Sequence, residues 1–339
     1  MRSAFGASFD VPDGYLNTAS IGVPPTFAAQ AVTEAVANWA SGRAKPGDFD
    51  EHVVAARAAF GRLIGVGAER VAIGASASQL VGLVAAGVEP GLRVLVAEED
   101  FTSLLFPFAA QEGVEITAVD LDDVGKLAPE HDLVAVSVVQ SADGRIADLD
   151  ALRRAREERG TRVLLDATQS AGWLPQPLDW ADWVVCHGYK WLLAPRGAAW
   201  LAVHPDAPEI TPHSGNWYAA ERPWESTYGL PMRLASDARR LDLSPVWLAQ
   251  VGAAASMEWL AGLDLHEVAA HCTGLADELR ARLGVEPAGS AIVSISGTDA
   301  VAKLTAAGIE CAARNGRARM AFHLYNTTDD VERAVRALG

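Results

Sequence analysis

Short apolar runs alternate with segments of helical periodicity through the first 200 residues. The apolar runs predict strands, and the amphipathic or alanine-rich segments between them predict helices. The expected strands are 71–73, 93–97, 114–119, 133–139, 163–165, 183–186 and 197–203, and the expected helices include 26–40, 50–64, 77–88 and 149–159. This alternation predicts an α/β fold, with a mostly parallel central sheet and helices on both faces.

The pattern changes after residue 204. Residues 205–245 are rich in Pro, Trp, Ser and Gly with little periodicity, and so long an irregular stretch usually has a function. A helix at 245–263, followed by a helix, a strand and a helix within 265–307, predicts a linking helix and a small C-terminal α+β domain. We therefore expect an N-terminal segment (1–45), a large domain (46–245) and a C-terminal part (246–339).

Composition narrows the class of protein. A chain of 339 residues, half of them hydrophobic, is long enough for one large and one small domain. The net charge of −15 disfavours nucleic acid and anionic membranes as partners. Cys186, Cys272 and Cys311 are too scattered for a disulfide framework or a metal site, and no segment resembles an export signal or a membrane span. A cytoplasmic protein without a metal is expected.

Two charged residues follow two of the expected strands. Asp166 ends the apolar run 163–165, and Lys190 lies in the polar turn after the run 183–186. Strand ends in α/β folds meet at the carboxyl edge of the sheet, where ligands bind. A lysine that forms an imine and a carboxylate that keeps a pyridine nitrogen protonated are the pair that pyridoxal chemistry requires. Either residue alone is usually a solvated side chain or a cap, so the hypothesis rests on their joint placement.

The surrounding motifs carry a family resemblance. Asp-Ala-Thr-Gln-Ser-Ala-Gly at 166–172 and Gly-Tyr-Lys-Trp-Leu-Leu-Ala-Pro-Arg-Gly at 188–197 resemble class V aminotransferases. These are fold-type-I pyridoxal-phosphate enzymes that include cysteine desulfurases, isopenicillin-N-epimerase-like proteins and kynureninases. The resemblance implies that Asp166 faces the ring nitrogen, Gln169 the ring hydroxyl, and Lys190 forms the Schiff base. Desulfurases carry His directly before the lysine, and Tyr189 stands there in this chain.

A turn of small residues, Gly-Ala-Ser-Ala-Ser at 74–78, joins an expected strand to an expected helix. Such a turn can bind an anion through backbone N–H groups and the helix N-terminus. The resemblance implies that Ala75 and Ser76 hold the cofactor phosphate, with Ser78 as a further candidate; a serine-capped helix without a ligand is the alternative. The turn is also one glycine short of the Gly-x-Ser-x-Gly nucleophile elbow, so a serine hydrolase that uses Ser76 competes with this hypothesis.

Other cofactor contacts are implied by the resemblance alone. Phe101 would stack on the pyridine ring, and His187 and Tyr189 would help to hold the phosphate. An ordinary core Phe and an ordinary core or turn His are the alternatives. Both roles of Phe101 predict a buried ring.

Substrate contacts are likewise implied. Arg319 would bind the substrate carboxylate, for which a guanidinium is suited by its two parallel hydrogen bonds, although chemistry alone does not choose among it, Arg314 and Arg317. Asn17 lies with Thr18 and Ala19 in a segment that covers the site in the family. Gln140 and Ser141 follow the strand 133–139; Gln140 is the substrate candidate, and which of the two points inward is open.

The resemblance implies a homodimer that acts on a small amino acid. Asn216, Trp217 or Ser244 would lie near the neighbouring subunit's site. Lys190 would move the substrate's α-proton after a Schiff base forms with the substrate, and Asp166 would stabilise the resulting carbanion. Aminotransferase or epimerase/lyase-like chemistry is expected.

Two further alternatives stay open. A cysteine desulfurase or C–S lyase is the first alternative. A desulfurase needs a mobile nucleophilic cysteine, and Cys311 lies only eight residues before Arg319 with no long loop around it. A non-catalytic protein that binds pyridoxal phosphate on the same fold is the other alternative.

Overall fold

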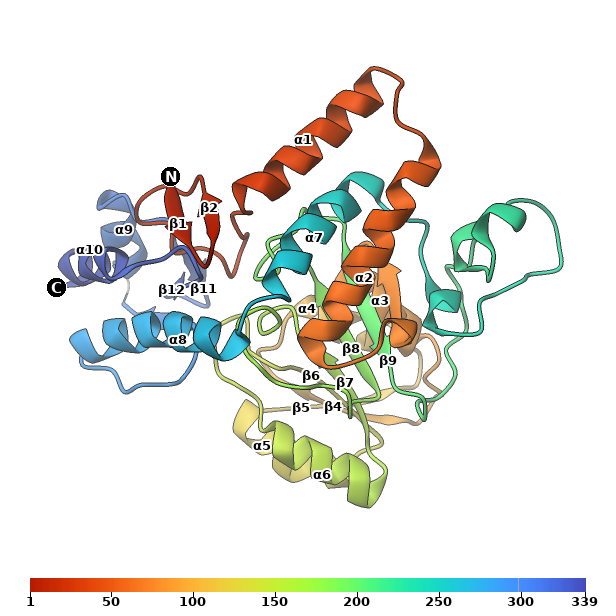
Figure 1. Ribbon diagram of the computed structural model, residues 1–339. Coiled ribbons are helices and arrows are strands. Elements are labelled where there is room, and N and C mark those ends of the chain that lie inside the picture. Colours follow the sequence, from red (N-terminus) through yellow and green to blue (C-terminus); the bar gives the residue numbers. More distant parts are fainter. Residues whose placement is uncertain (298) are drawn as a thin grey trace.

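The computed structural model describes residues 1–297 and 299–339, and its core is a seven-stranded sheet (Figure 1). The strand order is β3 (Val71–Gly74), β9 (Ala199–Val203), β8 (Trp183–His187), β7 (Arg162–Asp166), β6 (Leu133–Ser137), β4 (Arg93–Ala97) and β5 (Glu115–Val119). Only β9 runs antiparallel to its two neighbours, β3 and β8. The expected mostly parallel sheet is therefore confirmed.

Helices cover both faces of the sheet, as predicted. One face packs on α2 (Asp50–Ile64), α5 (Leu121–Leu127), α6 (Leu149–Arg159) and α7 (Trp247–Leu260), and the other on α3 (Ala77–Ala85) and α4 (Thr102–Ala109). Successive strand residues point to opposite faces, so Leu165 joins the first core and Leu164 the second. None of the helices in the described residues is long and apolar enough to cross a membrane.

Most expected elements lie within a few residues of their predicted bounds, with informative exceptions. The expected strand 133–139 ends at Ser137, because the chain then turns back and Val139 pairs with Ile146 outside the main ladders. The short helix α5 and the hairpin of β1 (Arg2–Ala4) and β2 (Ala7–Phe9) were not predicted. The helix α1 (Thr26–Ala40) begins where expected and projects beyond the body of the molecule (Figure 1).

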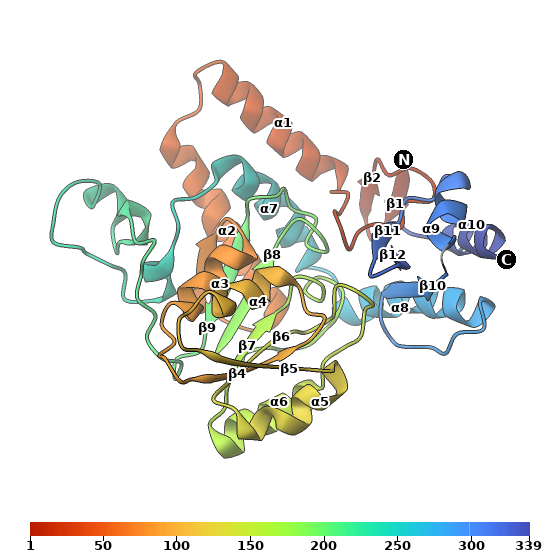
Figure 2. The same cartoon turned by 180° about the vertical axis from the view of Figure 1, so that it is seen from behind.

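The small domain combines the two ends of the chain. Its antiparallel sheet has the order β10 (Ile292–Ser296), β12 (Arg317–Ala321) and β11 (Ala312–Arg314), and it carries α8 (Leu265–Arg282), α9 (Ala300–Ala306) and α10 (Thr328–Leu338). The β1–β2 hairpin lies beside it in both views (Figures 1 and 2). Arg2 binds Asp330, and Leu16 is buried in the apolar core of this domain. The segment boundaries at 45/46 and 245/246 stay a prediction.

Residues 205–245 form short 3₁₀ turns joined by irregular chain: η4 (Trp217–Ala219), η5 (Pro223–Glu225) and η6 (Ala238–Leu241). Residues 213–235, here called the arm, project on the side opposite the small domain (Figure 2). A buried ion pair ties the end of the segment to the large domain. Both terminal nitrogens of Arg57 donate to Asp242, at 3.0 and 2.6 Å, and Asp242 also accepts the Ile73 N–H.

We expect Asp242→Ala to lower the free energy of unfolding by about 3 kcal/mol, because it leaves the Arg57 charge buried without a partner. Denaturant unfolding measures the loss. The control is Asp132→Ala, which breaks an exposed pair with Arg93 and should cost less than about 1 kcal/mol. Equal losses for the two variants would contradict a special role of the buried pair.

Candidate active site

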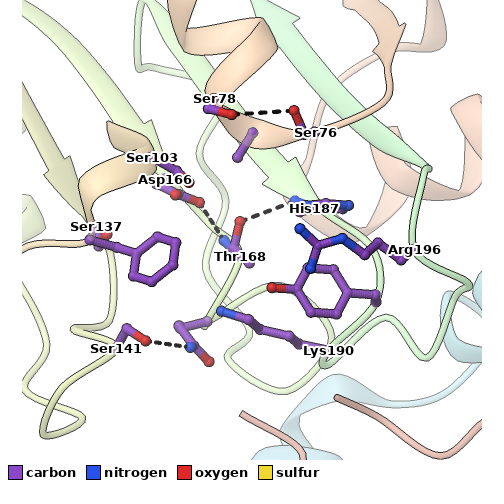
Figure 3. A pocket seen from close by; sticks show the side chains of 14 residues that line it. Ser76, Ser78, Ser103, Ser137, Ser141, Asp166, Thr168, His187, Lys190 and Arg196 are labelled. Atoms are coloured by element: carbon purple, nitrogen blue, oxygen red, sulfur yellow. Dashed lines mark hydrogen bonds between the residues drawn. The ribbon is translucent and has the colours of Figure 1, made fainter. Parts of the chain in front are cut away.

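A polar cavity lies at the carboxyl edge of the sheet. The parallel strands end there, so the connections that follow β3, β4, β6, β7 and β8 all contribute to its wall. Figure 3 shows the lining side chains: Ser76 and Ser78 lie at the top of the view, Lys190 and Ser141 at the bottom, and His187 and Arg196 on the right. Residues predicted from motifs far apart in the sequence thus share one space.

Lys190 and Asp166 both line this cavity. Asp166 is the last residue of β7, Lys190 lies in the turn after the neighbouring parallel strand β8, and both side chains are buried. Burial lowers the pKa of the Lys190 amine to about 8, although the charge of Asp166 opposes the shift. Burial raises the pKa of Asp166, whereas hydrogen bonds from Thr168, including its N–H at 2.8 Å, favour the ionised form. The site therefore holds an amine that loses its proton easily near a desolvated acid.

The N-terminal segment packs directly on the lysine turn. The Gly22 N–H donates to the Tyr189 carbonyl at 2.9 Å. A Cβ atom at Gly22 would lie 2.0 Å from the carbonyl oxygen of Lys190, so only glycine fits at this close approach. Leu193 has φ +56°, a left-handed conformation that closes the same turn. Packing of the first 25 residues thus restricts where the lysine backbone can lie.

The turn after β3 presents hydroxyl groups to the cavity. Ser76 caps α3 by accepting the Gln79 N–H at 3.3 Å, and the Ser76 and Ser78 hydroxyls are 3.3 Å apart. Both serines line the cavity. Ala75 does not, and its N–H donates to the Gln79 side chain at 3.3 Å. The serines and the first turn of α3 therefore form the part of this segment that is suited to an anion.

His187, Tyr189 and Arg196 form the adjacent wall. The His187 and Tyr189 rings meet edge to face at 4.4 Å, and the Arg196 guanidinium lies 5.0 Å from the centre of the Tyr189 ring. Burial, with Arg196 and Lys190 nearby, lowers the pKa of His187 to about 4, so its imidazole is neutral at pH 7. The buried Nε2 of His187 has no hydrogen-bond partner among the described residues. Sequence reasoning missed Arg196, although it lies inside the quoted lysine motif.

Phe101 lines the cavity, but the prediction that its ring would be buried is wrong. The side chain is 43% exposed. Phe101 is the N-cap residue of α4, in the connection that follows β4, and its ring faces the open cavity instead of the apolar core. The amine of Lys190 lies 5.3 Å from the ring centre. The ring is therefore available for contact with a ligand.

Two amides near the site are already engaged by the protein. The Gln169 side chain donates to the Ala19 carbonyl and to the Ser141 hydroxyl and accepts from the Trp191 indole, so its orientation is held by three contacts. Ser141 lines the cavity, whereas Gln140 lies outside it and donates to Asp100 at 3.0 Å. Of the two residues left open by the sequence, Ser141 is the one that points inward.

Arg319 borders the cavity through Ser141. Its Nη1 donates to the Ser141 carbonyl at 2.6 Å, and its Nη2 donates to the Ser20 hydroxyl at 2.7 Å. Burial, with a contribution from Arg314, lowers the pKa of Arg319 to about 10. Arg314 and Arg317 are exposed, so Arg319 is the buried one of the three candidates. Asn17 lies farther out, where it binds Glu310 at 3.3 Å and pairs with Ala321.

The geometry of the cavity gives less support to a cysteine desulfurase or to a serine hydrolase that uses Ser76. Among the described residues, no cysteine lines the cavity, and burial raises the pKa of the Cys311 thiol, which disfavours the thiolate. Ser76 forms no hydrogen bond to a histidine in the described part of the chain, so it lacks the adjacent base that a serine nucleophile requires. The same residues contain no cluster of metal-ligating side chains.

Comparison with known proteins identifies the family. The model of the family described as Aminotransferase class-V matches residues 28–295. The chain belongs to the class-V aminotransferase family. Its members include enzymes that use pyridoxal phosphate, so the family implies this cofactor, and the predicted resemblance is confirmed.

Relatives within this family differ in their chemistry. YcbU of Bacillus subtilis (strain 168), an uncharacterized aminotransferase, is 26% identical over 83% of this chain and 81% of its own length. The isopenicillin N epimerase of Streptomyces clavuligerus is 29% identical over 69% of this chain and 66% of its own. The solved structure of the cystine C-S lyase C-DES, in complex with cysteine persulfide, has a TM-score of 0.84 at 20% identity, covers 97% of both chains and supports the fold.

The pKa of Lys190 leads to a test. In the cofactor-free protein, the rate at which an amine-specific reagent modifies Lys190 should rise with pH through a midpoint near 8, because the reactive form is deprotonated. Peptide mass spectrometry resolves each lysine. Lys126 is the internal control, since its hydrogen bond with Asp123 raises its pKa and its midpoint should lie at higher pH than that of Lys190. Equal midpoints for the two lysines would contradict the shift.

Proposed function

We propose that this class-V aminotransferase family enzyme binds pyridoxal phosphate between Asp166 and Lys190 and acts on a small amino acid. The observation that carries the proposal is the shared cavity of a buried amine and a buried acid at adjacent strand ends. The reaction that we favour is transamination, or epimerase- or lyase-like chemistry, each of which begins at the α-carbon of the amino acid.

The residues of the cavity fit this cofactor. Asp166 offers a carboxylate for the ring nitrogen, and Lys190 a primary amine for the aldehyde. Ser76 and the start of α3 offer donors for the phosphate. The partnerless Nε2 of the neutral His187 supports a polar ligand on the same side. When bound, pyridoxal phosphate supplies an electron sink for charge that develops on the substrate's α-carbon.

Each residue then has a role at a stated atom. The neutral amine of Lys190 would hold the cofactor through its aldehyde and would also serve as the base that removes or returns the proton at the substrate's α-carbon. Asp166 holds the proton on the ring nitrogen, because a carboxylate in a desolvated site favours a cation beside it. The Phe101 ring, which lines the cavity, would lie against one face of the pyridine. Arg319 and Ser141 orient the substrate carboxylate.

Desulfuration and C–S bond cleavage form the second candidate. The likeness in fold to the C-S lyase C-DES keeps it open, and among curated relatives a probable cysteine desulfurase of Vibrio cholerae is 23% identical over 74% of this chain. A persulfide mechanism needs a mobile thiolate. The partly buried Cys311, with its raised pKa in the short connection before β11, is poorly suited to it. We therefore place transamination and epimerase- or lyase-like chemistry ahead of desulfuration through a persulfide.

Borohydride reduction tests the proposal. The purified protein loaded with pyridoxal phosphate should be yellow, bleach on reduction, and carry the reduced adduct on Lys190. Lys190→Ala should carry no adduct there and lose at least about 10⁴-fold in turnover, because it lacks both the attachment point and the base.

Lys303→Ala is the matched control. Lys303 is exposed, lies on α9 and pairs with Asp299, so its loss should change neither colour nor rate. An adduct on another lysine, or substantial turnover by Lys190→Ala, would refute the assignment. A panel of amino acids scored for keto acid, sulfide and inverted stereochemistry then separates the candidate reactions.

We also infer that the active form is a cytoplasmic homodimer. Tyr228, Leu230 and Met232 at the tip of the arm are 92%, 90% and 64% exposed, and such apolar groups together favour contact with a second protein surface. Asn216 and Trp217 lie in the arm, and the exposed Ser244 follows it, so an interface formed by the arm would bring one or more of them near the neighbouring subunit's site.

Replacing Tyr228, Leu230 and Met232 together by serine should weaken self-association, because it removes apolar area from the interface. Light scattering over a concentration series measures the effect, with the dimer dissociation constant expected to rise at least about tenfold. Val285→Ser, a half-exposed apolar position in the small domain, is the control. A monomeric unmodified protein, or an unchanged dimer in the triple variant, would contradict the inference.

A further inference from the structure

A second buried carboxylate, Asp100, lies behind the cavity wall. It follows β4 and directly precedes Phe101. Its side chain is buried but does not line the cavity. The function proposed above gives Asp100 no role. Burial of a carboxylate costs free energy unless hydrogen bonds compensate for its lost hydration.

Four donors surround this carboxylate. The Phe101 N–H, at 2.7 Å, and the Ser137 hydroxyl donate to Oδ1. The Ser137 N–H, at 2.7 Å, and the Gln140 side-chain amide, at 3.0 Å, donate to Oδ2. Every partner is a donor, so the position requires a group that only accepts. A carboxylate meets that requirement, and a carboxamide of the same shape does not.

These contacts connect two parts of the proposed cofactor site. Ser137 pairs with Asp166 in the ladder between β6 and β7, and the next residue's N–H donates to the Asp166 carbonyl at 3.0 Å. Asp100 thus binds the neighbour of Asp166 on one side and the backbone of Phe101 on the other. The series of contacts from the Asp166 backbone to the Phe101 backbone passes through the backbone of Ser137 and through one side chain, that of Asp100.

We propose that Asp100 is a positioning residue that sets the Phe101 ring relative to Asp166, so that the ring borders the space in which a planar ligand binds between Asp166 and Lys190. Gln140 belongs to the same device, as the fourth donor, instead of reaching the substrate. The proposal rests on the function proposed above. The negative charge of Asp100 also contributes to raising the pKa of Asp166.

Asp100→Asn is the test variant, and Asp182→Asn is its matched control. Asp182 is an equally buried carboxylate at the opposite edge of the sheet, where it accepts the Val163 N–H and binds Arg156 and Arg162. Both variants should lose stability, since each puts a carboxamide N–H₂ against donors. Only Asp100→Asn should act on the cavity.

In Asp100→Asn we expect about tenfold weaker binding of pyridoxal phosphate, measured by fluorescence titration. The free-energy cost of one buried donor without an acceptor corresponds to about that factor. The pH midpoint of the bound cofactor's absorbance should move to lower pH, because removing a nearby negative charge disfavours protonated forms. The double variant Asp100→Asn/Gln140→Glu should recover part of the affinity, since the new amide then donates to the new carboxylate.

A readout without cofactor separates this proposal from the one it rests on. Hydrogen exchange of the cofactor-free protein should show faster exchange at Phe101 and Ser137 in Asp100→Asn, and near Val163 in Asp182→Asn. If the unmodified protein carries no adduct on Lys190, the proposed function fails whatever the variants do. If the adduct forms but Asp100→Asn keeps its affinity, midpoint and exchange rates, the positioning role is refuted.

Discussion

The active-site architecture depends on holding an amine and an acid out of water at the ends of two adjacent strands. Desolvation works against both charges, and it lowers the pKa of Lys190 and raises that of Asp166. The protein tolerates this cost because the parallel strands β7 and β8 place the two groups on one cavity, where each lessens the other's shift. The same desolvation makes the amine a competent nucleophile at moderate pH.

The surroundings of this pair come from distant parts of the chain. The N-terminal segment contacts the lysine turn at Gly22 and holds Gln169 through the Ala19 carbonyl. The small domain reaches the same place through Arg319, which binds Ser20 and Ser141. Because both chain ends build the small domain, the wall of the cavity around Ser141 depends on the position of that domain.

Much of the fold and part of the site could be predicted from local sequence. The apolar runs and helical periods identified most strands and helices, since burial on a sheet or under a helix leaves a regular pattern. The motifs around Asp166 and Lys190 identified the family. The exposure of Phe101 was not predicted, because a helix-capping position at a strand end directs the ring away from the core, and no local pattern records that.

Local pattern therefore determined which connections reach the cavity, because an acid or a lysine at or just after the end of a buried parallel strand emerges at the carboxyl edge of the sheet. Only the folded chain decided which side chains in those connections face the cavity. The Gln79 side chain accepts a hydrogen bond from the Ala75 backbone N–H, and Asp100 accepts one from the Gln140 side-chain amide. Ser76 and Ser141 face the cavity instead. Each outcome depends on competition among hydrogen-bond partners, several of which are brought together only when the strands pair.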